Sequence, residues 1–436
     1  MNENSKIFFD KKILVYGLGK SGLSSFNFLK TISDVYLFDD NLNLKFRRSV
    51  KKRILPFKKL LNFKLDLIIL SPGIDINDCK LKHLLKKYNQ NIYTDLDIFY
   101  SFYKNNCITI TGTNGKSTTC KLLYDILKDQ KIDTKLVGNI GLPILSAKRI
   151  SKKTIFIIEA SSYQLEYSRI FSSKYAAILN ISPDHLERHG NLNKYIFAKF
   201  KLLKNQKKGS IGFVNRNDRF IQNRINKISY KFKLNHVDTR IKKSLQKKIK
   251  NQYFSSKTNQ ANLAFVLRII KNFPIKKKIL LKSINKFSGL NYRQQIIFQN
   301  KRLIIINDSK STSYSSSEEL LKMQNNIYWL IGGIPKKKDK LNLPKKYFKN
   351  IQVYVFGKNY QKFVNDLRNK IKLRKFTDLK RALDMILADI NNNKIRKNII
   401  LFSPASASFD NFKNFEDRGL YFNKLIKKYV YKRKIF

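Results

Sequence analysis

Short runs of apolar residues alternate with longer segments of helical periodicity along the whole chain. Apolar runs that are bounded by polar or glycine-rich stretches predict buried strands. The helical segments include one that reaches about Lys30 and one from Lys116 to about Lys128. The predicted strands are residues 12–16, 35–38, 65–70, 107–111, 154–158, 175–179, 303–306, 327–331, 353–356 and 398–402. Strands that alternate with helices predict parallel sheets covered by helices on both faces, which is an α/β fold.

The length of the chain predicts more than one domain, because a single hydrophobic core seldom organises 436 residues. The grouping of the predicted strands divides the chain into three domains at residues 1–97, 98–289 and 290–436. Ligands of open parallel sheets gather at the carboxyl ends of the strands, so the residues after each strand are the first candidates for chemistry. The Lys- and Asn-rich stretch 222–257 matches no element pattern, and we assign it no function.

Positive charge is the strongest feature of the composition. The chain has 89 Lys and Arg against 30 Asp and Glu, a formal net charge of +59. Because lysines occur in every segment and no basic tail stands apart, we interpret the charge as a solvated surface that attracts anionic substrates. We therefore expect no nucleic-acid partner.

The cysteines and the apolar runs indicate a compartment. Cys79, Cys107 and Cys120 form no C-x-x-C pair, which favours a reducing environment. No apolar run approaches the length of a membrane span, and the amino terminus lacks the pattern of a signal peptide. We expect a cytoplasmic protein that is not inserted in a membrane.

A glycine-rich loop is the strongest chemical motif, and its residues are Gly112, Thr113, Asn114, Gly115, Lys116, Ser117 and Thr118. It lies between a predicted strand and a predicted helix, where backbone N–H groups and the helix dipole can hold phosphate oxygens. Lys116 would bind the terminal phosphates, and Ser117 or Thr118 offers a hydroxyl to Mg²⁺. The loop is a variant of the P-loop pattern, because Ile110 stands where its first glycine belongs.

Two further motifs follow this loop along the chain. Glu159 comes after the predicted strand 154–158, so its carboxylate reaches the sheet edge that carries the loop and suits Mg²⁺. The alternative for Glu159 is a partner for a helix amino terminus or a salt bridge. His185 and His189 have the spacing of a zinc helix, but Glu187 stands at neither position that a metalloprotease motif requires.

Residues 17–22 form a G-x-G-x-x-G turn after the first predicted strand. Asp39 ends the next strand, at about the spacing expected for an acid that binds a ribose. The pattern predicts a pyrophosphate at a helix amino terminus. It leaves open whether the ligand is NAD(P) or a UDP-sugar.

Together, and in this order, the motifs resemble the Mur ligase family over nearly the whole chain. The strings that carry the resemblance are residues 17–24, 71–74, 112–118, 137–141, 159–166, 307–310 and 403–415. The strings Asn-Asp-Ser-Lys at 307–310 and Ser-Pro-Ala-Ser-Ala-Ser-Phe at 403–409 are most similar to those of the members that add D-glutamate. They favour these members over the other Mur ligases and the folylpolyglutamate synthetases.

The resemblance implies a fold and a reaction. The fold has a Rossmann-like UDP-binding domain, a central domain with a P-loop ATPase-like parallel sheet, and a Rossmann-like carboxyl-terminal domain. The reaction is the ATP-dependent addition of D-glutamate to UDP-N-acetylmuramoyl-L-alanine through an acyl phosphate, a cytoplasmic step of peptidoglycan precursor synthesis. ATP, the UDP-linked substrate and D-glutamate are the implied partners, and we expect a monomer.

The resemblance also implies which residues carry the chemistry. Lys116, His185 and Lys199 are the implied catalytic residues, and Ser117, Glu159, His185 and Lys199 are the implied ligands of two Mg²⁺ ions. Lys199 matches the lysine that carries a carbamate in this family. A carbamate would give a metal ion an anionic ligand where an ammonium would repel it.

The remaining implied positions bind substrates. The ATP positions are the loop residues 112–118 with Asn259, Asn262, Arg293 and Asp308. The positions for the UDP-linked substrate are Ser21, Asp39, Ser71 and Asn139. The D-glutamate positions are Lys310, Thr312, Lys336, Ser408 and Phe415.

Three positions depart from the family pattern. Asn41 stands where an arginine can occur near the uracil, and Tyr292 stands where a histidine is common before Arg293. Residues 332–338 replace the familiar Gly-Gly-Asp-x-Lys string, so the lysine that binds D-glutamate is Lys336 or one of the two lysines after it.

Other classes of protein make different predictions. A Mur-type ligase of another specificity would respond to a different amino acid. A nucleic-acid-binding ATPase would hydrolyse ATP when DNA or RNA is added, and no aromatic-basic motif supports this class. An NAD-dependent oxidoreductase would bind NAD without competition from UDP.

Overall fold

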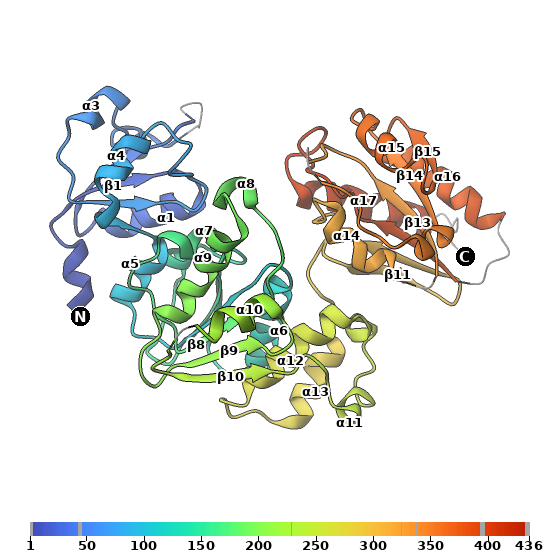
Figure 1. Ribbon diagram of the computed structural model, residues 1–436, viewed down its shortest axis with the longest axis horizontal. Helices are drawn as coiled ribbons and strands as arrows, with labels where there is room; N and C mark the ends of the chain where they lie inside the picture. Colours follow the sequence, from blue (N-terminus) through green and yellow to red (C-terminus); the bar gives the residue numbers. More distant parts are fainter. Residues whose placement is uncertain are drawn as a thin grey trace. The chain divides into compact units, whose positions relative to one another are not determined.

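The computed structural model describes residues 3–41, 46–227, 229–323, 325–336, 339–392 and 397–431. These residues form three sheets (Figure 1). The chain divides into two compact units, Met1–Phe287 with two of the sheets and Ser288–Phe436 with the third.

The first sheet is parallel, in the order β2-β1-β3-β4. Its strands are β1 (Lys12–Tyr16), β2 (Asp34–Phe38), β3 (Leu67–Leu70) and β4 (Ile92–Tyr93). The helices of this region are η1 (Glu3–Phe8), α1 (Lys20–Leu29), α2 (Arg48–Lys51), α3 (Phe57–Leu61), α4 (Lys82–Lys87) and η2 (Asn89–Asn91). β1 is one of the two inner strands, and its last four residues are buried on both faces, as the apolar run predicts.

The second sheet is also parallel, in the order β10-β9-β8-β5-β7-β6. Its strands are β5 (Cys107–Thr111), β6 (Thr134–Gly138), β7 (Ile155–Glu159), β8 (Tyr175–Ile178), β9 (Ile211–Asn215) and β10 (Lys233–Val237). The longer helices are α5 (Asp95–Phe102), α6 (Lys116–Asp129), α7 (Ser162–Tyr167), α9 (Leu192–Lys204), α10 (Arg219–Ile225), α12 (Lys257–Ile270) and α13 (Lys277–Lys286). The short ones are η3 (Ile144–Ser146), α8 (Leu186–His189), α11 (Lys243–Gln246) and η4 (Gln252–Ser255).

Alternate residues of β7 divide this sheet into two cores. Ile157 packs into the cluster that includes α6, α12 and α13, and Phe156 and Ile158 pack into the cluster that includes α5, α7, α9 and α10. Because successive side chains of a strand point to opposite faces, a continuous apolar run is buried only when helices cover both sides.

The third sheet has the order β11-β12-β16-β13-β14-β15 and is parallel except for the antiparallel edge strand β11. Its strands are β11 (Gln295–Gln299), β12 (Leu303–Asn307), β13 (Asn326–Ile331), β14 (Ile351–Phe356), β15 (Lys372–Phe376) and β16 (Asn398–Phe402). The helices of this unit are α14 (Tyr314–Leu321), η5 (Lys345–Asn350), α15 (Gln361–Leu367), α16 (Leu379–Asn391) and α17 (Phe415–Tyr431).

The α/β fold class is confirmed, and each sheet lies inside one of the three predicted domain ranges. α5 crosses the predicted boundary at residue 97, and the exact division into three domains stays a prediction. The stretch 222–257, which the sequence left unassigned, contains the end of α10, β10, α11 and η4 and reaches the start of α12. β11 was not predicted either.

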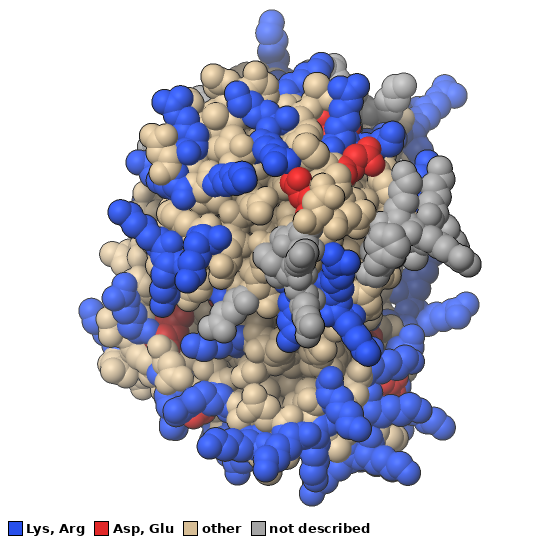
Figure 2. All heavy atoms as spheres, turned by 90° about the vertical axis from the view of Figure 1, so that its right-hand side faces the viewer, with Lys and Arg blue, Asp and Glu red and all other residues tan. Residues whose placement is uncertain are grey.

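Basic side chains are distributed over the surface. Figure 2 shows Lys and Arg spread across one face of the molecule among other residues, with few Asp and Glu between them. This agrees with the interpretation of the charge as a general surface property. No helix among the described residues is long and apolar enough to cross a membrane.

Asp97 fixes the segment after α7 to the start of α5. Its carboxylate is fully buried, and one oxygen accepts hydrogen bonds from the Ser168 hydroxyl and from the N–H groups of Arg169, Ile170 and Phe171. The other oxygen accepts from the N–H and hydroxyl of Thr94. One side chain thus satisfies four backbone donors that would otherwise be buried without a partner.

We expect Asp97→Ala to lower the free energy of unfolding by about 3 kcal/mol or more, because several buried donors lose their acceptor together. Urea denaturation followed by circular dichroism measures the change. Asp125→Ala is the control, since the Asp125 carboxylate forms only a partly exposed pair with Lys121 on α6; this change should cost about 0.5 kcal/mol or less. Equal effects of the two substitutions would contradict the prediction.

Candidate active site

The phosphate loop runs from β5 into α6, as the sequence predicts. Gly112 and Gly115 have positive φ values of 151° and 82°. A Cβ on Gly115 would lie 2.1 Å from the Oδ1 atom of Asn262 on α12. Both backbone shape and lack of space therefore require glycine at position 115. The same contact places Asn262, a predicted ATP residue, against the loop.

Two lysines meet at one carbonyl of this loop. The Gly112 oxygen accepts hydrogen bonds from the Lys116 amine at 2.9 Å and from the Lys199 amine at 2.8 Å. Lys116 also donates to the Thr113 oxygen at 2.8 Å. Lys199 projects from α9, is only 1% exposed, and lies 4.5 Å from the ring centre of Tyr195. The structure thus brings together two of the three predicted catalytic residues.

The environment of Lys199 disfavours its charged form. Burial holds the pKa of its amine well below the usual value, and the nearby charge of Lys116 acts in the same direction. Asp184 and Glu159 act in the opposite direction.

Ser117 and Glu159 present buried oxygens that the described residues do not satisfy. The Ser117 Oγ and the Glu159 Oε2 atoms have no hydrogen-bond partner among these residues. The other Glu159 oxygen accepts from the Asn139 side-chain amide at 2.9 Å. Oxygen atoms that lack hydrogen-bond partners are suitable ligands for a hard cation such as Mg²⁺. No cluster of three or more His, Cys, Asp or Glu able to hold a metal lies within the described part of the chain.

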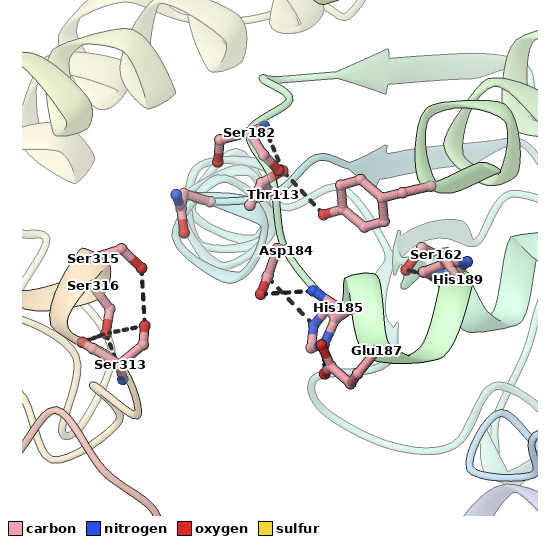
Figure 3. Close-up of polar contacts among 12 residues, drawn as sticks. Thr113, Ser162, Ser182, Asp184, His185, Glu187, His189, Ser313, Ser315 and Ser316 are labelled. Carbon is pink, nitrogen blue, oxygen red and sulfur yellow. Dashed lines mark hydrogen bonds and ion pairs between the residues drawn. The ribbon is translucent and has the colours of Figure 1, made fainter. Parts of the chain in front are cut away.

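His185 is the N-cap residue immediately before α8 and has a left-handed backbone, φ 53°. Its Nε2 atom lies 3.4 Å from the Asp184 carboxylate and its Nδ1 atom 3.9 Å from that of Glu187, as Figure 3 shows. His189 is buried instead, and its Nε2 atom lies 3.0 Å from the Ser162 hydroxyl. The two histidines therefore differ in their surroundings, and only His185 is partly exposed.

A tyrosine that the sequence did not single out joins the start of α6 to α12. The hydroxyl groups of Tyr253 and Thr118 lie 3.4 Å apart, and the Tyr253 carbonyl accepts from the Asn259 side chain at 2.9 Å. Asn259 and Asn262, both buried, thus lie on the helix that packs against α6. Tyr253 lies in the stretch that had no predicted element, so no local pattern marked it.

The glycine turn of the first sheet is closed by two predicted substrate residues. The Ser71 hydroxyl donates to the Gly17 oxygen at 2.6 Å, and the Leu18 N–H donates to the Asp39 carboxylate at 2.6 Å. A Cβ on Gly22 would lie 1.8 Å from the Gly17 oxygen, so this position has no space for a side chain. Asp39 and Ser71 shape the turn that would receive the UDP group, and Ser21 lies on the helix after it.

In the second unit, Asp308 follows β12 and is buried. Its carboxylate accepts hydrogen bonds from the Gln294 N–H at 3.0 Å and from the Ser403 hydroxyl at 2.9 Å. Burial raises its pKa to about 7, while these hydrogen bonds and the charges of Arg293 and Arg418 act in the opposite direction. Arg293 and Asp308, both predicted ATP residues, are thus near each other.

The predicted D-glutamate residues also lie in this unit. The Lys310 amine stands 4.0 Å from the ring centre of Phe415, which begins α17. Ser408 is buried, and Thr312 precedes the Ser313, Ser315 and Ser316 hydroxyl cluster that starts α14 (Figure 3). Lys336 is exposed, and Lys337 and Lys338 lie outside the described residues.

A parallel sheet with a strand-loop-helix phosphate site, accompanied along the chain by two further α/β sheets, defines the class of multidomain phosphate-loop enzymes. Comparison with known proteins narrows the class. Residues 110–280 match the model described as Mur ligase middle domain, and residues 11–92 match the Mur ligase MurD-like, N-terminal domain.

Relatives match the chain over almost its full length. The UDP-N-acetylmuramoylalanine–D-glutamate ligase of Rickettsia felis is 33% identical over 98% of this chain and 99% of its own. The enzyme of the same name from Buchnera aphidicola is 32% identical over 97% of this chain and 99% of its own. The chain therefore belongs to the Mur ligase family.

Solved structures share the fold. UDP-N-acetylmuramate-alanine ligase MurC from Thermotoga maritima matches with a TM-score of 0.56 and 16% identity, over 97% of this chain and all of that chain (100%). MurF ligase from Thermotoga maritima in complex with ADP matches with a TM-score of 0.55 and 15% identity, over 98% of this chain and 100% of that chain.

The raised pKa of Asp308 predicts how the stability of the second unit depends on pH. Folded Asp308 keeps its proton up to about pH 7, whereas an unfolded Asp releases it near pH 4. The folded state therefore binds more protons between these values, so stability falls as pH rises through this window and levels off above about pH 7. The full change is on the order of 3–4 kcal/mol.

Urea denaturation at several pH values measures this effect. Trp329 is the only tryptophan of the chain, is fully buried in β13, and donates to the Ser403 oxygen, so its fluorescence reports on this unit. Asp308→Asn should flatten the pH dependence, and Asp417→Asn, at an exposed position on α17, should keep it. The same slope in Asp308→Asn and the unaltered chain would show that another group is responsible.

Proposed function

We propose that this chain joins D-glutamate to UDP-N-acetylmuramoyl-L-alanine with the consumption of ATP, in the synthesis of peptidoglycan precursors. The observation that supports it best is the meeting of Lys116 and Lys199 at the Gly112 carbonyl, in a site where one oxygen each of Ser117 and Glu159 has no hydrogen-bond partner among the described residues. This arrangement suits a phosphoryl group, and the relatives that match the whole chain carry this reaction in their names.

The reaction must first activate a carboxylate, which is a poor electrophile. A carboxylate oxygen of the UDP-linked substrate attacks the γ-phosphorus of ATP, the bond to the ADP oxygen breaks, and an acyl phosphate forms. The D-glutamate nitrogen then attacks the acyl carbon, phosphate leaves with the C–O electron pair, and the nitrogen loses a proton. Lys116 holds the γ-phosphate oxygens and stabilises their charge during the transfer.

Ser117, Glu159, His185 and a carbamylated Lys199 would hold two Mg²⁺ ions, which supply positive charge against the phosphate oxygens when bound. In the carbamylation, the Lys199 nitrogen bonds to the carbon of CO₂ and releases one proton. The product is an anionic oxygen donor at a position where an ammonium would repel a cation. The burial of Lys199 supports this proposal, since it favours the uncharged amine that reacts.

The substrates would occupy separate parts of the chain. Ser21, Asp39, Ser71 and Asn139 would hold the UDP-linked substrate. The loop 112–118 with Asn259, Asn262, Arg293 and Asp308 would hold ATP, and Lys310, Thr312, Lys336, Ser408 and Phe415 would orient D-glutamate. We also propose three domains at 1–97, 98–289 and 290–436, a monomeric state and a cytoplasmic location.

Phosphate release by the purified chain tests the reaction. With ATP, Mg²⁺ and UDP-N-acetylmuramoyl-L-alanine present, we expect D-glutamate to start steady phosphate release. Lys116→Ala should lower kcat by about 10²–10³-fold, roughly 3–4 kcal/mol, because the transferring phosphoryl group loses a charged donor.

Lys121→Ala is the matched control, since Lys121 lies on the same helix and pairs with Asp125. It should keep nearly full activity. Release that responds to another amino acid and not to D-glutamate would replace the proposed specificity, and near-normal turnover by Lys116→Ala would contradict the role of the loop.

Carbamylation of Lys199 has its own spectroscopic test. After equilibration with ¹³C-bicarbonate, the unaltered chain should show a carbamate ¹³C resonance that is absent in Lys199→Arg, because a guanidinium does not form this adduct. Lys199→Arg should also lose activity by about a hundredfold. Lys204→Arg, an exposed position on the same helix, should keep both the resonance and the activity. An unaltered chain without the resonance would contradict carbamylation.

A further inference from the structure

Arg418, on α17, is a completely buried arginine that no sequence motif identified. Its guanidinium donates to the carbonyl oxygens of Ser309, Gly332, Ser406 and Ala407 at 2.8, 3.3, 2.9 and 3.4 Å. It also donates to the hydroxyl groups of Ser309 and Ser406 at 3.1 and 3.4 Å. All three nitrogens of the fork are therefore used.

These acceptors belong to three loops that follow three different strands. Ser309 follows β12, Gly332 follows β13, and Ser406 and Ala407 follow β16. β12, β16 and β13 are neighbours in the sheet. The guanidinium thus joins the carboxyl ends of three adjacent strands, the edge where ligands of such sheets gather.

The same loops lead directly to the predicted D-glutamate residues. Lys310 comes after Ser309, Lys336 lies four residues beyond Gly332, and Ser408 comes after Ala407. Phe415 begins the helix that carries Arg418, and its carbonyl accepts from the Ser309 hydroxyl at 2.9 Å. A backbone bridge between Ile334 and Ala407 ties two of the loops together. Arg418 therefore contacts the loops that carry these residues.

The energetic cost of burying this cation indicates that the geometry of its hydrogen bonds matters. No carboxylate of the described residues lies within 4.0 Å of the Arg418 nitrogens, and Asp410 and Asp308 act on its charge only from farther away. A buried charge without an ionic partner is costly unless hydrogen bonds replace its water shell. Here neutral carbonyl and hydroxyl oxygens do so, and only a planar fork reaches three loops at once.

The backbone around Arg418 is shaped to fit it. Gly333 has φ 123°, and a Cβ at this position would lie 2.9 Å from the Nη1 atom of Arg418 and 2.4 Å from the Ala407 oxygen. The loop after β13 thus approaches the guanidinium too closely for any side chain. The Ser406 hydroxyl also donates to the Gly332 oxygen at 2.6 Å, so the two loops share their contacts with Arg418.

We propose that Arg418 is a positioning residue of the D-glutamate site, which sets the spacing of Lys310, Ser408 and Phe415 through the loops that carry them. The inference rests on the proposed function. It requires that Arg418 affect the binding of D-glutamate more than the binding of the other two substrates.

Steady-state kinetics of Arg418→Lys with each substrate varied in turn tests the inference. A lysine keeps the charge but cannot bridge three loops, so KM for D-glutamate should rise about tenfold or more. The KM values for ATP and the UDP-linked substrate should stay within about twofold, since this change leaves their predicted contacts in place. Arg381→Lys, at a largely exposed position on α16, is the control and should change none of the three.

Ser309→Ala is a second, milder variant: it removes the hydroxyl that accepts from Arg418 and donates to the Phe415 carbonyl, and it leaves the guanidinium. It should raise KM for D-glutamate about threefold. In the Arg418→Lys background the same substitution should have a smaller effect, because the two residues act through one contact. Trp329 fluorescence shows whether each variant is folded.

The outcomes separate this inference from the proposed function. Equal increases in all three KM values, or an unchanged KM for D-glutamate in folded Arg418→Lys, would overturn the positioning role. If Arg418→Lys does not fold, an unchanged KM in folded Ser309→Ala overturns it, and a selective rise supports it. No response of the unaltered chain to D-glutamate would overturn the proposed function, and the inference with it.

Discussion

The hydrogen bonds that Lys116 and Lys199 donate to the Gly112 carbonyl are the contact on which the central site depends. They require Gly112 to turn its oxygen toward both amines, and its φ of 151° belongs to a region that suits glycine. They also require the loop after β5 to lie against α9, although 87 residues separate Gly112 from Lys199. The parallel sheet provides this arrangement, because the connections after its strands return to the same edge.

In the second unit, buried charged side chains likewise hold the loops at the edge of a parallel sheet. At its sheet edge a cation, Arg418, gathers backbone and hydroxyl oxygens, and a carboxylate, Asp308, gathers an N–H group and a hydroxyl. In both units the charged side chain holds loops whose backbone groups would otherwise lack partners. The cost of burying charge is accepted where several loops must keep one geometry.

Much of the fold could be predicted because its inner strands are buried on both faces. β1, β5 and β16 have the predicted bounds, since each is a short run of mainly apolar or β-branched residues with a clear end. β10 and β15 were missed because both are edge strands in which polar residues interrupt the apolar pattern, and each begins with an exposed lysine, Lys233 or Lys372. Their strand conformation comes from pairing with a neighbour, which a local pattern does not record.

The parts of the candidate site that are continuous in sequence could be predicted from the residues, and the parts that depend on distant residues could not. The phosphate loop is continuous in sequence, so its strand, its glycines and its lysine were visible together. The role of Lys199 came only from the resemblance, because nothing in the local sequence distinguishes a buried lysine from the many exposed ones. Tyr253 and Arg418 escaped notice, since their partners lie 135 residues away for Thr118 and 109 residues away for Ser309.

The unsatisfied groups of the central site point to what completes it. Lys116 and Lys199 donate to the same carbonyl, and the charge of Lys116 favours the uncharged amine of Lys199. The Ser117 and Glu159 oxygens lack hydrogen-bond donors among the described residues, and a cation would satisfy them. A metal ion would satisfy these oxygens, and a phosphate group held by the loop and a metal ion attract each other. Each should therefore bind more tightly when the other is present, because the protein has arranged both halves of the charge balance before either arrives.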